Sequence, residues 1–126
     1  MQAGCEGRAA TQVGTPGRDN LAGTGGNDVV LALGGNDTID SGSGDDIVCG
    51  SSGQDRIETG SGNDVLRGDA GDDRLDAGGD QDRLFGDAGI DRLFGGGDPD
   101  QLDGGNGTPD YCNGEGGTSS RRRPTR

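Results

Sequence analysis

An aliphatic residue returns every nine positions from residue 14 to residue 103. In each nine-residue unit, glycine and polar residues come first, an aspartate stands at position six and the aliphatic residue stands at position eight. Side chains alternate between the two faces of an extended segment, so position eight faces one side while positions seven and nine face the other. Positions seven and nine often carry charge, as in Arg74 and Asp76, and we therefore predict that position eight faces inward. The ten aliphatic residues at position eight are Leu21, Val30, Ile39, Val48, Ile57, Leu66, Leu75, Leu84, Leu93 and Leu102.

A strand that covers only positions seven to nine buries one side chain, which is too little for a core of its own. Such units become stable by stacking, because each unit then buries its inward residue against its neighbours. In units four to nine the first two turn residues alternate as S-G, G-S, T-G, G-D, A-G and G-D, so the structural period is two nonapeptide units. We therefore predict an all-β fold: a two-sheet, parallel β-solenoid with about 18 residues per coil and a glycine-rich turn on each edge.

The repeat divides the chain into three parts. Residues 1–13 do not carry it and are predicted to form an N-terminal cap segment, with a short strand at residues 10–13. Residues 14–112 are predicted to form the repeat domain, with ten clear nonapeptides to residue 103 and one degenerate unit, Gly104–Cys112. Residues 113–126 are polar, end in R-R-R-P-T-R, and are predicted to form a disordered basic tail.

The composition is unusual for a folded domain. Only 25% of the 126 residues are hydrophobic, 30 are glycine, and the formal net charge is −12. Such a chain is often disordered, because too little apolar surface is available to offset its conformational entropy. A disordered acidic spacer is therefore an alternative, although it does not require an aliphatic residue two places after every aspartate. The negative charge disfavours nucleic acid and anionic membranes as partners and favours cations, and the longest apolar run, Val29–Leu33, is too short to span a membrane.

The predicted coils place the aspartates of position six in two columns, one on each edge. Strands of successive coils lie ~4.8 Å apart, so the carboxylates of one column repel each other unless a cation lies between them. Calcium takes oxygen ligands from carboxylates and carbonyls in a flexible geometry, and glycine turns expose carbonyls. The chain has no histidine, and its three cysteines form no C-x-x-C pair, which disfavours zinc, copper and haem. Magnesium remains an alternative that needs a stricter geometry.

The units, such as T-G-S-G-N-D-V-L-R at Thr59–Arg67, resemble the G-G-x-G-x-D-x-U-x nonapeptide of RTX, or haemolysin-type, calcium-binding proteins. The resemblance covers residues 14–103. It implies a parallel β-roll with several calcium ions in its turns, in a secreted, extracellular bacterial protein. It also implies that the side-chain ligands are the ten position-six aspartates, while the coordinating carbonyls stay open. These aspartates are Asp19, Asp28, Asp37, Asp46, Asp55, Asp64, Asp73, Asp82, Asp91 and Asp100.

The predicted function is calcium binding with calcium-coupled folding, because a metal site that does not exist in the unfolded chain links binding to folding. We predict no enzyme and no catalytic residues, since the chain lacks histidine, an H-E-x-x-H motif and a G-x-S-x-G elbow with triad partners. The alternative is a non-catalytic surface, adhesive or secretion-assisting module of a larger toxin, protease or lipase system. That alternative implies an extracellular protein or surface as a partner.

Two departures from the pattern fall at position four, where Asp80 and Asp98 replace glycine on the same edge. Each either adds a carboxylate ligand or spoils its turn, so the neighbouring Asp82 and Asp100 are the least regular of the predicted ligands. On the outer faces, Phe85 and Phe94 are interpreted as isolated surface aromatics or as packing at a coil end, rather than as a binding strip.

The outward residues at positions seven and nine show no regular threonine array, which argues against an ice-binding face. Phe94 occupies position nine of the unit after that of Phe85 and is therefore expected on the opposite face. The arginines at position seven are interpreted as balancing neighbouring acids rather than recognising a ligand; they are Arg56, Arg74, Arg83 and Arg92.

The cysteines lie far apart in the predicted stack. Cys49 and Cys112 fall on opposite sheets and several coils apart, beyond the reach of a disulfide. Cys5 could fold back onto Cys49, which would leave Cys112 free or bonded to a partner. The first residues, M-Q-A-G-C, lack the basic and apolar regions of a signal peptide, so either a leader has been removed or secretion uses another route.

Overall fold

A computed structural model describes residues 4–5, 7–96, 100–105, 111–113 and 120–122. For Gly4 and for the last two ranges it describes the backbone alone. The described residues form strands and turns, and they contain no helix of the length and hydrophobicity needed to cross a membrane.

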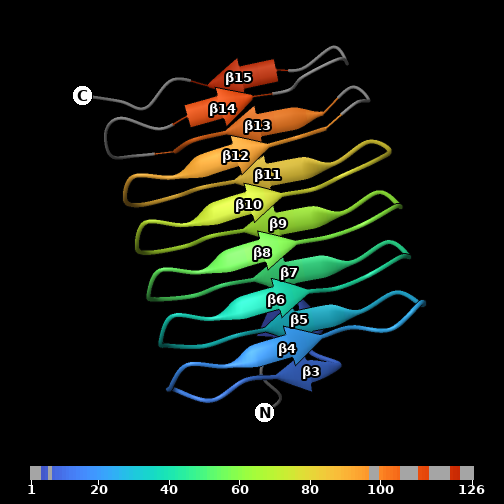
Figure 1. Cartoon of the computed structure of the whole chain (residues 1–126), viewed down its shortest axis with the longest axis vertical. Coiled ribbons are helices and arrows are strands. Elements are labelled where there is room, and N and C mark those ends of the chain that lie inside the picture. Colours follow the sequence, from blue (N-terminus) through green and yellow to red (C-terminus); the bar gives the residue numbers. More distant parts are fainter. Residues whose placement is uncertain (1–3, 6, 97–99, 106–110, 114–119, 123–126) are drawn as a thin grey trace.

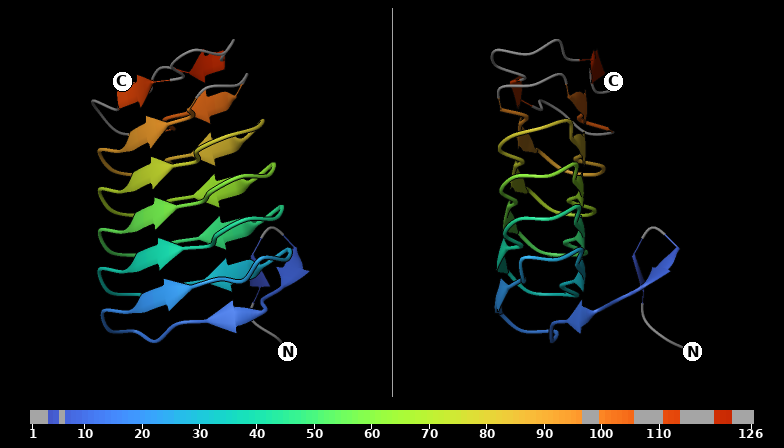
Figure 2. Two further views of the ribbon diagram at one scale, coloured as in Figure 1. Left: turned by 45° about the vertical axis from the view of Figure 1, so that its right-hand side comes forward. Right: turned by 90° about the vertical axis from the view of Figure 1, so that its right-hand side faces the viewer.

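Thirteen strands form two parallel sheets, and successive strands alternate between the sheets (Figure 1). The seven-stranded sheet contains β3 (Gln12–Val13), β5 (Val29–Leu31), β7 (Ile47–Cys49), β9 (Val65–Arg67), β11 (Arg83–Phe85), β13 (Gln101–Asp103) and β15 (Ser120–Arg122). The six-stranded sheet contains β4 (Asn20–Ala22), β6 (Thr38–Asp40), β8 (Arg56–Glu58), β10 (Arg74–Asp76), β12 (Arg92–Phe94) and β14 (Tyr111–Asn113). The coils stack along the long axis of the molecule, with the two sheets face to face (Figure 2).

The register of the sheets follows the predicted coil. Leu66 pairs with Val48 on one side and with Leu84 on the other, each two nonapeptide units away in the sequence. Every strand in the regular part of the roll therefore lies beside the strand two units earlier and the strand two units later. The predicted parallel β-solenoid, with two nonapeptides in each coil, is confirmed.

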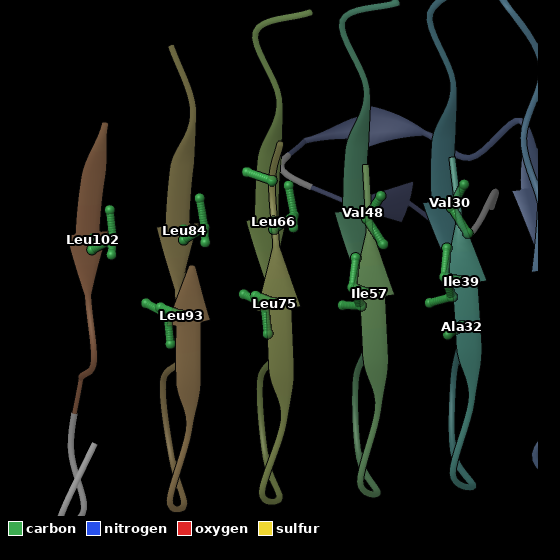
Figure 3. Close-up of a cluster of buried hydrophobic side chains, with 11 residues drawn as sticks. Val30, Ala32, Ile39, Val48, Ile57, Leu66, Leu75, Leu84, Leu93 and Leu102 are labelled. Atoms are coloured by element: carbon green, nitrogen blue, oxygen red, sulfur yellow. The ribbon is translucent and has the colours of Figure 1, made fainter. Parts of the chain in front are cut away.

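Position eight fills the space between the sheets (Figure 3). Nine of the ten aliphatic residues are buried, and only Leu21, in the first coil, is partly exposed. Each buried aliphatic side chain contributes roughly 1.5–3 kcal/mol when it leaves water. The core is therefore one line of aliphatic side chains from each sheet, and no single strand is stable without its neighbours.

Position one also faces the core, which the sequence pattern did not predict. Where this position is not glycine, it holds a small side chain that is buried: Ala32, Ser41, Thr59 and Ala77. The hydroxyl of Thr59 donates to the carbonyl of Ala77 in the next coil, at 2.9 Å. These residues close the edges of the core beside the turns, where a larger side chain has no room.

The N-terminal segment is attached to the outside of the roll. Strand β3 lies within the predicted strand at residues 10–13, and it pairs with β5. Strands β1 (Gly4–Cys5) and β2 (Arg8–Ala9) form an antiparallel pair, and β1 lies against β5 and β7. A disulfide joins Cys5 to Cys49, with their Cα atoms 5.9 Å apart, so this pairing is confirmed.

The C-terminal strands carry one extra residue per coil. Leu93 pairs with Cys112 and Leu102 pairs with Arg121, so each partner lies one position further along the chain than in the preceding coils. Cys112 therefore lies in the six-stranded sheet, opposite the sheet of Cys49, as predicted. The prediction of a disordered tail at residues 113–126 is wrong for Asn113 and for Ser120–Arg122, whose backbone pairs with the preceding coil. The other residues of that tail lie outside the described residues.

Leu66→Ala tests the stacked core. Leu66 has no exposed surface, and its truncation leaves a cavity between the sheets. We expect the free energy of unfolding in saturating calcium to fall by about 2–5 kcal/mol, measured by denaturant titration. The control is Ile90→Ala, because Ile90 is 47% exposed at an edge turn. We expect Ile90→Ala to change stability by less than about 0.5 kcal/mol; equal losses in the two variants would contradict the core described above.

Candidate metal centre

The aspartates of position six lie where each turn enters its strand. The first, Asp19, is partly exposed, and the other nine are buried, with at most 8% of their surface exposed. One edge of the roll, on the left in Figure 1, carries Asp19, Asp37, Asp55, Asp73 and Asp91, and the opposite edge carries Asp28, Asp46, Asp64, Asp82 and Asp100. The structure therefore brings the ten predicted residues together in the two predicted columns.

Hydrogen bonds link the aspartates of each column. The backbone N–H of Asp55 donates to Oδ1 of Asp73 at 2.8 Å, and the N–H of Asp64 donates to Oδ1 of Asp82 at 2.8 Å. The same bond joins every other successive pair in both columns. From the second aspartate of each column onward, one carboxylate oxygen is thus occupied by the coil before it, and the side chain is held in one orientation.

The second carboxylate oxygen is buried and accepts no hydrogen bond in several of these residues, among them Asp37, Asp55, Asp73 and Asp82. Burial of a carboxylate is costly unless it is paired, and a buried polar atom without a partner is rare in folded proteins. These Oδ2 atoms repeat along both edges. A cation is the partner that would satisfy all of them in the same way.

Burial raises the pKa of the carboxyl groups in the middle of both columns. The pKa is raised to about 7 for Asp55 and Asp64, to about 8 for Asp82 and to about 9 for Asp73. Desolvation is the largest cause, the hydrogen bond from the preceding backbone N–H opposes it, and the neighbouring aspartates of the column add repulsion. Without a cation, burial in the folded roll therefore disfavours the ionised form of these carboxyl groups.

Carbonyl oxygens of position four form a second column on each edge. Gly35 and Gly53 have φ values of +89° and +103°, in the left-handed region that favours glycine. A Cβ built on Gly35 would lie 2.5 Å from the carbonyl oxygen of Gly17, and a Cβ on Gly53 would clash with the carbonyl oxygen of Gly35. Within the described residues, no backbone hydrogen bond ends on the carbonyls of Gly17 or Gly35. These oxygens are therefore free to bind a cation.

The donor set fits a hard cation. No group of three or more His, Cys, Asp or Glu side chains gathers at one point among the described residues, so carboxylates alone do not enclose an ion. Carboxylate oxygens and main-chain carbonyls of the same turns supply oxygen ligands only. Such a set suits calcium, which binds six to eight oxygens with variable geometry, and does not suit zinc or copper.

Comparison with protein-family models agrees with this donor set. The model of the RTX calcium-binding nonapeptide repeat matches four times, at residues 13–48, 50–84, 78–109 and 85–118. The chain belongs to the RTX calcium-binding nonapeptide repeat family. Searches of curated proteins and of solved structures found no match. The RTX β-roll is a structural calcium-binding module rather than a catalytic fold, so the repeat confirms the predicted family and architecture and implies calcium as the ion.

A second series of hydrogen bonds between successive turns of the RTX roll was not predicted from the sequence. At position five, the side-chain oxygen of one coil accepts the backbone N–H of position five in the next coil. Asn36 accepts from Gln54 at 2.8 Å, and Asp72 accepts from Ile90 at 2.8 Å. The other edge repeats the arrangement. Asn or Asp at position five in five of the ten units was the available signal.

The turn that contains Asp80 is intact, although the sequence left open whether this residue spoils its turn or adds a carboxylate ligand. Its φ of +68° lies in the left-handed region, and its Oδ2 accepts the backbone N–H of Gly62 at 2.8 Å. Spoiling of the turn is therefore wrong for Asp80, whose carboxylate supports the preceding coil. Asp98, the second departure, lies outside the described residues.

Gly53→Ala tests the carbonyl column. The alanine Cβ would be forced against the carbonyl of Gly35 at a φ of +103°. We expect a loss of about 1–3 kcal/mol in the free energy of unfolding in saturating calcium, measured by denaturant titration. Gly79→Ala is the matched control, because a Cβ at Gly79 meets nothing within 4 Å. The carbonyl column would be contradicted if Gly53→Ala were no more harmful than Gly79→Ala.

The raised pKa values predict how pH acts on the metal-free chain. The pKa values of about 7 to 9 in the fold lie above the ordinary value of 3.8, so the folded state binds more protons than the unfolded state. Stability from these groups is therefore fully present below the ordinary pKa of 3.8 and is lost as pH rises from there through the folded-state pKa values of about 7 to about 9. We expect the β content in chelator, followed by circular dichroism, to fall between about pH 5 and pH 9. A β content that rises with pH in chelator would show the opposite linkage.

Proposed function

We propose that this RTX chain binds calcium ions along both edges of its β-roll and that it folds as it binds them. The ten position-six aspartates supply the side-chain ligands, and the carbonyls of the position-four glycines supply main-chain ligands. The observation that carries the proposal is the repeated buried Oδ2 atom without a hydrogen-bond partner, as in Asp37, Asp55 and Asp73. Bound calcium would supply the positive charge that these buried carboxylates need.

Folding and binding are coupled because the site belongs to two coils at once. Asp55 and Asp73 stand two nonapeptide units apart and meet only when their coils stack. In the unfolded chain the same carboxylates are solvated and separate, so calcium binds them weakly there. A ligand that prefers the folded state stabilises it by an amount that grows with ligand concentration at each site. Many such sites along the roll would compensate for the small stabilisation that the aliphatic core provides.

An extracellular location agrees with one feature of the structure and with the general behaviour of calcium-binding modules. The Cys5–Cys49 disulfide is of a kind that persists in oxidising compartments and is rare in the cytosol. Extracellular calcium-binding modules also work with weak sites, because the free ion is abundant there. We therefore propose a secreted protein whose β-roll stays unfolded at low calcium and folds after export.

Calcium titration tests the proposal directly. We expect calorimetry to show several bound ions per chain, and circular dichroism to show that β content appears with calcium and is lost in EDTA. Asp64→Asn should lower the calcium affinity and shift the folding midpoint to higher calcium, because Asp64 is buried in the middle of a column. Asp40→Asn is the control, since Asp40 is an exposed residue of β6 at position nine.

Two results would contradict the proposal. The first is the same β content with and without EDTA at neutral pH. The second is an Asp64→Asn variant that binds calcium like the wild type, or an Asp40→Asn variant that loses affinity to the same extent.

A further inference from the structure

A long groove follows one edge of the RTX roll, beside the six-stranded sheet. It has a volume of about 570 Å³ and crosses five coils, from Arg18 in the first to Arg92 in the fifth. Four spacings of ~4.8 Å make the groove about 19 Å long. Position-five side chains, including Asn36 and Gln54, line it on the side of the turns, and position seven lines it on the side of the sheet. Its shape suits an elongated ligand that runs along the stack.

Arginines form a column in this groove. Arg56, Arg74 and Arg92 lie on β8, β10 and β12 and pair with each other in register. Like charges placed directly opposite each other on neighbouring strands destabilise a sheet. In the first two coils of the same sheet, position seven holds the neutral residues Asn20 and Thr38. Three successive arginines are therefore a feature that the fold does not require.

The expectation that these arginines balance neighbouring acids is met only in part. Arg56 forms an ion pair with Glu58 at 3.4 Å, and Arg74 lies over the ring of Phe94, 4.7 Å from its centre. Among the described residues, no carboxylate lies within salt-bridge distance of Arg74 or Arg92. The Nε of Arg74 is shielded from solvent and donates to no acceptor. A buried donor without a partner is rare in folded proteins, and Arg74 is one of the residues that line the groove.

Calcium decides the charge of the groove. Asp37, Asp55 and Asp73 also line the groove. Together with Asp72 they equal in number the arginines that line it, which are Arg18 and the three arginines of the column. When calcium binds as proposed above, the carboxylates of the column are neutralised, while the arginines keep their charge. The inference below therefore rests on the proposed function. It assigns to the calcium-loaded roll an anion-binding groove that the metal-free chain does not offer.

We propose that this groove binds a linear acidic polysaccharide, with Arg56, Arg74 and Arg92 each engaging one carboxylate or sulfate group. Guanidinium binds such groups through two parallel hydrogen bonds. One sugar ring of an extended chain is about as long as the ~4.8 Å spacing of the strands, so the anionic groups of such a chain repeat at about the axial spacing of the arginines. Single-stranded nucleic acid fits less well, because it needs aromatic side chains for stacking and Arg74 covers Phe94.

The chain contains a matched control for this proposal. Arg92 and Arg83 begin identical Arg-Leu-Phe strands, both are exposed at position seven, and they lie on opposite sheets. The calcium-loaded full chain and its variants are titrated by calorimetry with a galacturonate tetramer, which is too short to gel with calcium. The other probes are a sulfated chondroitin tetrasaccharide, neutral maltotetraose and a short single-stranded oligonucleotide. Calcium binding and β content are measured for each variant in parallel.

We expect saturable binding of at least one acidic tetrasaccharide and none of maltotetraose. Arg92→Gln should weaken this binding roughly tenfold, the value of one charge-assisted interaction, while Arg83→Gln should leave it unchanged. Equal losses in the two variants would indicate unspecific attraction and overturn the groove. An oligonucleotide that binds as tightly, with the same dependence on Arg92, would overturn the ligand class.

Calcium binding separates the two proposals. If the wild type binds calcium and folds but binds neither acidic tetrasaccharide, the groove is wrong and the proposed function stands. If the wild type binds no calcium, the proposed function fails, and the groove fails with it.

Discussion

A buried carboxylate in every turn is the constraint on which this structure depends. Stacking the coils brings nine of the ten position-six aspartates out of water, and in eight of them the preceding coil supplies a hydrogen bond to only one carboxylate oxygen. Desolvation and repulsion raise the pKa of the central aspartates, so the folded chain without a cation is poorly compensated. A cation bound there would remove this cost and would thereby act both as a ligand and as part of the fold, and calcium suits the oxygen donors that the turns present.

The rest of the architecture follows from how little else holds the coils together. Each strand from β4 to β13 adds one inward aliphatic side chain, and position one adds only small side chains such as Ala32 and Ala77. Ladders of hydrogen bonds at positions five and six tie each turn to the next, so that stability spreads along the stack and is not concentrated in a centre. At the N-terminal end, the Cys5–Cys49 disulfide fixes a small antiparallel pair to the outside of the seven-stranded sheet.

The two faces of the roll use the same repeat differently. On the six-stranded sheet, position seven becomes a column of arginines beside the aspartate column of one edge. On the other sheet, Arg83 bonds to Gln101 and Arg67 pairs with Asp87. If calcium neutralises this edge as proposed, the metal site and the neighbouring row of guanidinium groups would form one electrostatic unit. Calcium would therefore control both the folding of the chain and the charge of its binding surface.

The coil, the inward position eight and the two columns of aspartates follow from the repeat alone. A nine-position period with a strict aliphatic residue and alternating turns allows few other arrangements. Three features depend on the packing of the coils: position one is buried, Asp80 adopts a left-handed φ, and one carboxylate oxygen of residues such as Asp55 and Asp73 has no hydrogen-bond partner. The physical reason is that periodicity reports which side of a strand a residue occupies, whereas the direction of a turn carbonyl or a carboxylate oxygen depends on the neighbouring coil, two nonapeptide units away.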